Sequence, residues 1–96
     1  MNILDVSNPE KVLKKAVKYL GPNVEICLSN RKDKKYAVYN PHTKKWIHFG
    51  NSNFSDFTKH QDDERRKNYL ARSAKIRGNW KDNKYSPNNL SRNILW

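Results

Sequence analysis

The residues of this chain that could carry acid–base or metal chemistry are few and scattered. Its histidines are His42, His48 and His60, and its one cysteine is Cys27. Metal sites need several such side chains at characteristic spacings, and neither a close pair of cysteines nor an HExxH arrangement is present. Asp56 lies four residues before His60, but a carboxylate–imidazole pair without a nucleophile is weak evidence for catalysis. The sequence therefore predicts no catalytic residues, no metal site and no cofactor.

Cationic side chains are far more numerous and follow a pattern of their own. Arg65, Arg72 and Lys75 recur at helical spacing, together with Asn68. Guanidinium groups match the geometry of phosphate oxygens, so this face is the main candidate for phosphate contacts. The opposing interpretation is a solvated helix face that binds nothing. The predicted nucleic-acid contacts are Arg65, Arg66, Arg72, Lys75, Arg77, Lys44, Lys45 and Lys59.

Aromatic and imidazole side chains supply a second set of candidates. Trp46, His48, His60 and Trp96 could stack on a base or contact a protein partner. Rings of this size are usually buried. The favoured interpretation is therefore that a second layer of core covers Trp46 and His48. Residues 94–96, Ile-Leu-Trp, should dock, either internally or on a partner.

Composition narrows the class of protein. The 96 residues fit a single domain with a modest core. Their net charge is +11 and their pI about 10.0, which favours an anionic partner, most commonly nucleic acid. No run approaches the roughly 20 apolar residues of a membrane span, and the first residues lack the apolar segment of a signal peptide. We expect a protein that acts inside a cell and is not secreted.

An amphipathic helix is predicted within residues 1–22. Ser7 would cap it, with Glu10 three positions on as the reciprocal partner, and Gly21 would end it in the left-handed conformation. The apolar side chains that share one face at helical spacing are Val12, Leu13, Ala16, Val17 and Leu20.

Residues 23–50 predict a three-stranded antiparallel meander. Apolar and polar residues alternate over 24–28, 35–39 and 45–49, and turns separate these stretches. In the third strand Ile47 and Phe49 point to the same face. We expect one core that contains Ile47, Phe49, Val12, Val17, Ile26 and Leu28.

Residues 51–96 predict a helical, basic half. A single helical turn is expected over 54–60, and the acidic residues 62–64 should open a longer helix that Gly78 ends, with Ile76 on its inward side. Ser86 and Pro87 should start a last short helix. The predicted fold class is therefore α+β: an N-terminal helix, a three-stranded antiparallel β-meander and C-terminal helices in one domain over residues 1–96.

Several short segments in combination resemble a known family. They are residues 34–38 (KKYAV), 44–50 (KKWIHFG), 56–60 (DFTKH) and 65–72, with Trp80 and residues 95–96. Over residues 29–96 the chain is similar to small basic proteins of nucleocytoplasmic large DNA viruses, the giant viruses of algae and amoebae among them. The resemblance implies a viral origin, with a location in the virion or in the host cell interior, at a cytoplasmic virus factory or in the nucleus. It brings no activity with it.

These observations lead to two main hypotheses about function. The first is a non-enzymatic small basic viral protein that binds nucleic acid, foremost DNA, through backbone phosphates, largely independent of sequence, and that could be packaged in the virion. The alternative is a structural virion component, such as a minor capsid or core-lining protein, which acts through protein–protein contacts. A third hypothesis, an enzyme such as a nuclease, lacks an acid–base and metal set.

Overall fold

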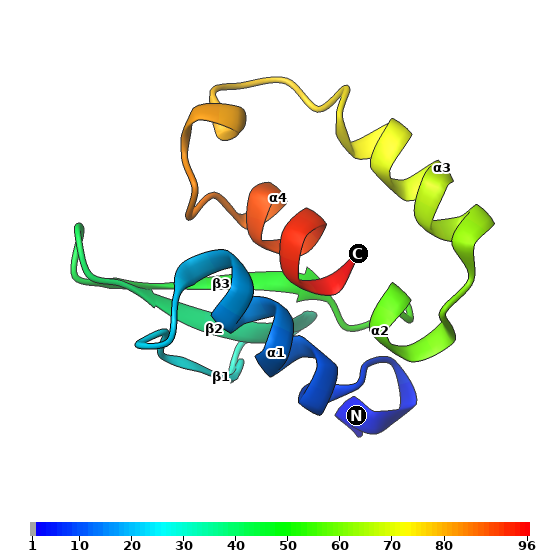
Figure 1. The fold of residues 1–96 in the computed structure, drawn as a ribbon, viewed down its shortest axis with the longest axis horizontal. Coiled ribbons are helices and arrows are strands. Elements are labelled where there is room, and N and C mark those ends of the chain that lie inside the picture. The colour runs from blue at the N-terminus through cyan, green and yellow to red at the C-terminus, as the bar shows by residue number, and fades with distance from the viewer. Residues whose placement is uncertain (1) are drawn as a thin grey trace.

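The chain forms a layer of helices on one face of a small sheet (Figure 1). The computed structural model describes residues 2–96. Its elements are α1 (Pro9–Leu20), β1 (Ile26–Leu28), β2 (Lys34–Asn40), β3 (Lys45–Asn51), α2 (Phe57–His60), α3 (Asp63–Ser73) and α4 (Pro87–Leu90), followed by the π-helical turn η3 (Ser91–Leu95). Two short 3-10 turns, η1 (Ile3–Asp5) and η2 (Trp80–Asp82), complete the set. The predicted α+β class, with its N-terminal helix, sheet and C-terminal helices, is confirmed.

The sheet is an antiparallel meander, as the alternating pattern predicted. Its strand order is β1-β2-β3. Tyr36 in the central strand lies between Leu28 and Phe49, and Val38 pairs with Ile47. Because successive side chains alternate between faces, this register directs Tyr36, Val38 and Phe49 to the same side. The helices pack on that side.

The core joins the first helix, the sheet and the last helical segments. Val12 and Phe49 are buried as predicted, whereas Ile26 and Ile47 pack against the core from partly buried positions. The buried cluster consists of Val12, Ala16, Tyr36, Val38, Phe49, Leu90, Ile94 and Leu95. Since the C-terminal residues fill the space between α1 and the sheet, the two ends of the chain share one core.

Val17 and Leu28 were expected in the core, and this prediction is wrong. Their exposed fractions are 38% and 56%. Val17 follows the fully buried Ala16 by about 100° around α1 and therefore faces away from the packed side. Leu28 lies on the edge strand β1, beside a groove that separates this strand from α1.

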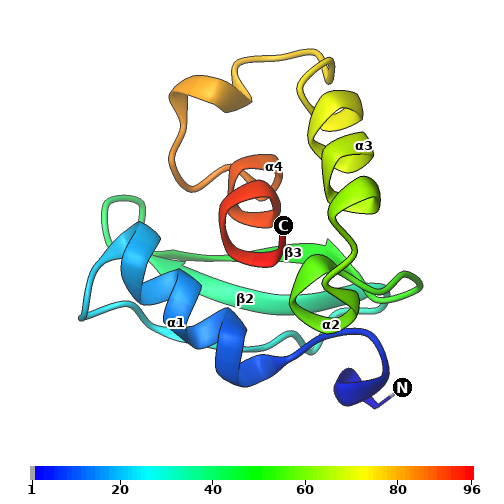
Figure 2. The same cartoon turned by 45° about the vertical axis from the view of Figure 1, so that its right-hand side comes forward.

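Among residues 2–96 no second layer covers the opposite face of the sheet, contrary to the favoured interpretation of Trp46 and His48. The helices gather on one side of the strands (Figure 2). Trp46 is 44% exposed and makes an edge-type contact with the Tyr39 ring, at 5.5 Å between centroids. His48 is partly buried, and its Nδ1 lies 2.7 Å from the Ser29 hydroxyl.

Both ends of α1 differ in detail from the prediction. Asn8, one residue after the predicted cap Ser7, accepts a hydrogen bond from the Lys11 N–H and caps the helix. Pro9 takes the first helical position, where its missing N–H costs nothing. Ser7 is instead buried. Gly21 has a positive φ of 102°, but its ψ of 169° is outside the left-handed helical region.

Helix α3 ends at Ser73, well before the predicted stop at Gly78. After Ala74 the backbone tightens: the Lys75 N–H donates to the Arg72 carbonyl and the Ile76 N–H to the Ser73 carbonyl. Such three-residue bonds are typical of a helix that is finishing. Lys75 is therefore off the helix, and Ile76, expected on the inward side, is 52% exposed.

The other C-terminal helices begin close to their predicted positions, although the turn expected over 54–60 is helical only over Phe57–His60. Ser86 caps α4 by accepting from the Asn89 N–H, with Pro87 in the first turn. Asp62 caps α3 by accepting from the N–H groups of Glu64 and Arg65. Within residues 2–96, no helix has the length and apolar character that crossing a bilayer requires.

Candidate functional site

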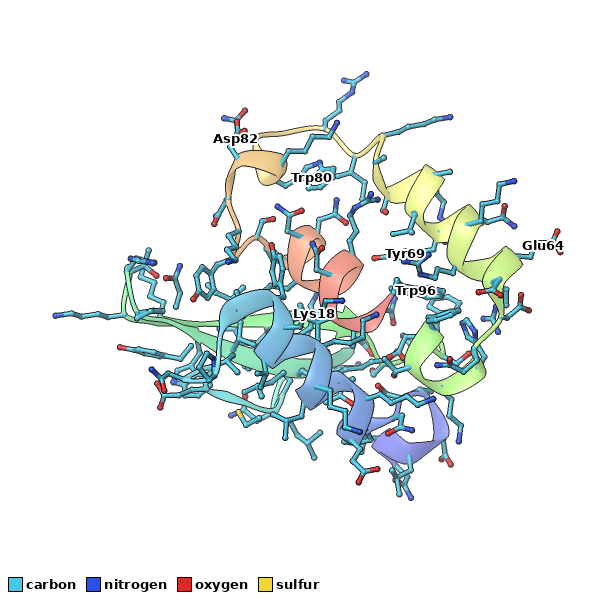
Figure 3. The ribbon with its side chains drawn as sticks, in the orientation of Figure 1. Lys18, Glu64, Tyr69, Trp80, Asp82 and Trp96 are labelled. Carbon is cyan, nitrogen blue, oxygen red and sulfur yellow. The ribbon has the colours of Figure 1, made fainter. Side chains whose placement is uncertain are left out.

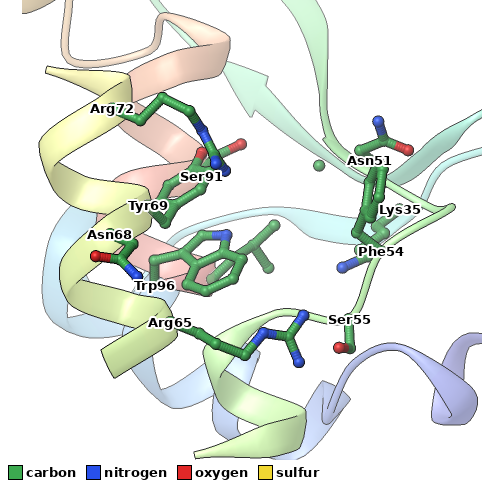
Figure 4. Close-up of a pocket in the computed structure, with 12 residues that line it drawn as sticks. Lys35, Asn51, Phe54, Ser55, Arg65, Asn68, Tyr69, Arg72, Ser91 and Trp96 are labelled. Atoms are coloured by element: carbon green, nitrogen blue, oxygen red, sulfur yellow. The ribbon is translucent and has the colours of Figure 1, made fainter. Parts of the chain in front are cut away.

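A pocket of about 510 Å³ lies between α3 and the edge of the sheet (Figure 4). Helix α3 forms one wall, and the end of β3 with the segment that follows it, residues 51–55, forms the opposite wall. The end of η3 and Trp96 lie between them. The lining residues are Lys35, Gly50, Asn51, Phe54, Ser55, Arg65, Asn68, Tyr69, Arg72, Ser91, Leu95 and Trp96.

The charge of this pocket is positive. Lys35, Arg65 and Arg72 line it, and no Asp or Glu is among the described residues that do so. Lys35 forms an ion pair with Asp56, the only one within 4 Å between side chains of residues 2–96. The net charge therefore comes from Arg65 and Arg72, which reach inward from α3 on either side of Trp96 (Figure 4).

Stacked aromatic rings form the α3 side of the pocket. Trp96 lies nearly parallel to Tyr69, with 4.3 Å between ring centroids and 11° between planes, and it also packs on His60 at 5.2 Å. Figure 3 shows Tyr69 and Trp96 meeting between α3 and the last turn of the chain, with Trp80 apart from them. Trp96 thus docks internally, one of the two outcomes predicted. Across the pocket, Phe54 is 63% exposed.

A buried polar network supports the sheet side of the pocket. The Lys35 ammonium donates to the Asp56 carboxylate at 3.0 Å and to the Val6 carbonyl at 3.3 Å. The Thr58 hydroxyl bonds the other Asp56 oxygen and lies 3.2 Å from the Ser7 hydroxyl. The residues of this network, Lys35, Asp56, Thr58, Ser7 and Tyr36, are at most 3% exposed.

Burial perturbs the titration of two members of this network. It lowers the pKa of the Lys35 ammonium, although the neighbouring Asp56 carboxylate acts in the opposite direction. It raises the pKa of Tyr36, whose hydroxyl donates to Ser7 at 2.8 Å, to about 12. The network links the segment between η1 and α1, which contains Val6 and Ser7, to β2 and α2.

His60 is a structural neighbour of the pocket. Its Nδ1 accepts from the Asp62 N–H at 2.9 Å, which leaves the proton of the neutral ring on Nε2. That Nε2 is buried and has no hydrogen-bond partner among the described residues. Burial and then the Arg65 charge lower the pKa of His60, against the opposing effects of Asp62 and Asp56. The ring is therefore held neutral beside Trp96.

Two arginines position α3 against the rest of the molecule. Arg92 donates to the Leu70 carbonyl at 2.7 Å and to the Ser73 hydroxyl, so it caps the C-terminal turn of α3. Arg66 donates from Nε to the Trp96 carbonyl at 2.6 Å and lies over the Phe57 ring. Arg65 and Arg72 are thereby presented to the pocket from a helix that is fixed at both ends.

The structure brings together only part of the predicted phosphate-binding set. Arg65, Arg72 and Trp96 line the pocket, whereas Arg66 packs beside it. Lys75 and Arg77 follow the end of α3, and Lys59 lies exposed on α2. The single cationic helix face that would have included Lys75 is therefore a wrong prediction, because the helix is too short.

The β2–β3 hairpin separates the other predicted residues from the pocket. Lys44 and Lys45 lie at the hairpin turn, and this turn is at the opposite end of the molecule from α3 (Figure 1). Trp46 follows them on the open face, which it shares with His48. These four side chains do not contribute to the pocket.

Sequence reasoning missed Lys35, Asn51, Phe54 and Tyr69 as residues of one site. The pairing of β2 with β3 and the turn after β3 bring Lys35 and Phe54 to the same pocket. Neither residue belongs to a recognisable sequence motif. No group of three or more His, Cys, Asp or Glu side chains that could hold a metal ion occurs among residues 2–96.

Among the comparisons with known proteins, the one with protein families gives a match. Residues 24–73 match the model of a family of unknown function, DUF5754, and so cover just over half of the chain. The chain belongs to this family. No curated protein and no solved structure matches it significantly. The DUF5754 match includes Lys35, Asp56, Arg65, Tyr69 and Arg72, whereas α1, α4 and Trp96 lie outside it.

Proposed function

We propose that this DUF5754 protein is a non-enzymatic nucleic-acid-binding protein that holds backbone phosphates at the pocket beside α3. One observation carries the proposal: Arg65 and Arg72, neither in an ion pair among residues 2–96, flank the Tyr69–Trp96 stack in a pocket whose described lining contains no Asp or Glu. Planar guanidinium groups donate two parallel hydrogen bonds to a phosphate, and aromatic rings accept a base on their faces.

The charge of the whole chain supports the same ligand class. A net charge of +11 on 96 residues attracts a polyanion over distances comparable to the Debye length, about 8 Å at physiological salt. Phosphate contacts carry no base identity, so binding should be largely independent of sequence. DNA is the first ligand to test, as the sequence predicted.

The test is the salt dependence of binding by the full chain. Fluorescence anisotropy with a labelled 20-nucleotide DNA should show binding at low salt and a linear fall of log K with log salt concentration. Two arginine contacts with supporting lysines should give a slope of about −2 or steeper. If no DNA or RNA binds even in about 20 mM salt, the proposal is wrong.

A viral role remains a prediction. Packaging in a virus particle, and a location in the virion or the host cell interior, rest on the sequence resemblance alone. Detection of the protein in purified particles of a virus that encodes it would support packaging; its presence only in infected cells would argue against it.

A second candidate function is contact with a protein, and an apolar groove between α1 and β1 favours it. The groove measures about 210 Å³, and Leu13 and Leu28 at its rim are 51% and 56% exposed. Exposed apolar surface of this kind marks interaction sites. Binding of a second copy of this chain in the groove is disfavoured, because each copy has a net charge of +11. The partner would therefore be an acidic amphipathic helix that contacts the lysines of α1.

Cys27 makes the groove testable, because it is the only cysteine, is exposed and lines the groove. An environment-sensitive dye on Cys27 should respond to a synthetic helical peptide with leucines on one face and glutamates on the other. The response should disappear in the Leu13→Ser/Leu28→Ser variant and with a scrambled peptide. Equal responses from both proteins would rule out this groove as the binding site.

A further inference from the structure

The two walls of the pocket carry different aromatic side chains. This difference affects whether the pocket can bind single-stranded or duplex nucleic acid. Phe54 stands on the sheet side and is 63% exposed, whereas Tyr69 and Trp96 form the opposite side (Figure 4). The exposed Phe54 ring therefore offers an aromatic face in a pocket that is also lined by cationic side chains. A flat heteroaromatic ring that entered the pocket would cover it.

The loop that carries Phe54 has a defined structure. The Asn51 side chain accepts from the Asn53 N–H at 2.9 Å, and the Phe54 N–H donates to the Asn51 carbonyl at 3.3 Å. Gly50 precedes this loop with a φ of 84°, and a Cβ there would come within 2.8 Å of Leu95. These hydrogen bonds fix the turn that carries Phe54, whose ring lies at the rim of the pocket.

The pocket has the size of a site for a single nucleotide. Its volume of about 510 Å³ falls within the range of small-molecule sites, roughly 300–1,000 Å³. A base inside a duplex could reach the Phe54 ring only by leaving its stack and its partner, which costs free energy. A base in a single strand is already accessible.

The two arginines are spaced to bracket such a base. Arg65 and Arg72 are seven residues apart on α3, which is about 10 Å along its axis at 1.5 Å per residue. They approach the pocket from its two ends, with Trp96 between them (Figure 4). Phosphates on the two sides of one nucleotide would then each meet a guanidinium group.

We propose that the pocket binds one unpaired nucleotide of a single-stranded nucleic acid, with the base against Phe54 and the flanking phosphates at Arg65 and Arg72. This inference rests on the proposed function and adds to it a preference for single strands. The side-chain amides of Asn51 and Asn68, also in the lining, are placed to contact the base edge or the sugar.

The test compares single-stranded and duplex DNA at equal phosphate number, by anisotropy with the full chain. The single strand should bind at least tenfold more tightly, and Phe54→Leu should reduce that binding by about tenfold, within the range for loss of one base stack. Duplex binding should stay unchanged in Phe54→Leu. The matched control is Trp46→Leu, which removes an exposed ring from the open sheet face and should change neither affinity.

Competition identifies the minimal ligand. Thymidine 5′-monophosphate should displace the single strand at lower concentration than inorganic phosphate does, because only the nucleotide offers a base to Phe54. Equal affinity for single strand and duplex, unaffected by Phe54→Leu, would overturn this inference and leave the proposed function intact. Failure to bind either DNA at low salt would overturn both.

Discussion

At the scale of single residues, the most consequential feature is an ion pair out of contact with water. The side chains of Lys35 and Asp56 are 2% and 0% exposed. Desolvation of two charges nearly cancels their attraction, so such a pair adds little net stability, but loss of one partner leaves the other buried and uncompensated.

Replacement of Lys35 by methionine should therefore lower the free energy of unfolding by about 3–5 kcal/mol. Urea denaturation monitored by tryptophan fluorescence would measure it. Lys34→Met is the matched control: its side chain is exposed in the same strand, and it should change stability by less than about 0.5 kcal/mol. Similar stabilities of the two variants would show that the buried pair is not essential to the fold.

His60 gives the fold a predictable response to acid. Its pKa in the folded protein lies below the ordinary value of 6.5, chiefly because of burial and the nearby Arg65. The unfolded chain thus takes up a proton at higher pH than the folded chain does. The contribution of His60 is complete above about pH 6.5 and is lost as the pH falls toward the lowered pKa.

His60→Asn should reduce this acid sensitivity. Asparagine keeps an acceptor for the Asp62 N–H and cannot be protonated in this range. Between pH 7.5 and 5, its free energy of unfolding in urea should decline less steeply than that of the wild type. Parallel declines would show that His60 titrates in the folded protein as it does in the unfolded chain.

At the scale of elements, the sequence patterns found the helices and strands better than their ends. Alternation and helical spacing correctly predicted α1 and all three strands. Helix α1 and strands β2 and β3 each bury side chains in a shared core, and Ile26 of β1 packs against that core. The end of α3 was not predictable in the same way. Ile76 continues the apolar spacing of the helix and Gly78 is a common helix-ending residue, so the sequence predicted a helix that is too long. The hydrogen bond to the Leu70 carbonyl near the actual end comes from Arg92, about twenty residues further along the chain.

The network around Lys35 escaped prediction for a related reason. Its members are separated by up to 51 residues, and lysine, aspartate and serine normally lie at the surface. Only the folded chain shows that Ser7, assigned as a helix cap, instead meets Thr58 and Tyr36. Local propensity contains no information about such distant pairing.

Arg92 should control the stability of α3 more than that of the core. Arg92→Met removes the hydrogen bonds to Leu70 and Ser73, and bonds to charged groups contribute about 1.5–3 kcal/mol each. Amides in α3 should exchange with deuterium at least tenfold faster, while those of β2 change little. Arg77→Met, beyond the helix end, is the control. Unchanged exchange in α3 would mean that other contacts hold the helix.

At the scale of the whole molecule, the basic charge falls into separate regions. Arg65 and Arg72 meet at the pocket, while Lys44 and Lys45 lie at the far hairpin turn (Figure 1). The sequence predicted that all of these residues contact phosphate, since charge and spacing do not reveal which cations converge. In the structure Arg65 and Arg72 line a pocket with aromatic walls, whereas Lys44 and Lys45 lie outside it.

The measurement that tests the central claim most directly is a comparison of two variants with equal loss of charge. Arg65→Gln/Arg72→Gln and Lys44→Gln/Lys45→Gln each remove two positive charges, and both should remain folded because the four side chains are exposed. Binding of a labelled single-stranded DNA would be followed from about 20 to 200 mM salt. The pocket variant should lose more than tenfold in affinity and one to two units of salt slope, whereas the hairpin variant should lose less than threefold. Equal losses in the two variants would show that diffuse net charge, and not the pocket, attracts nucleic acid.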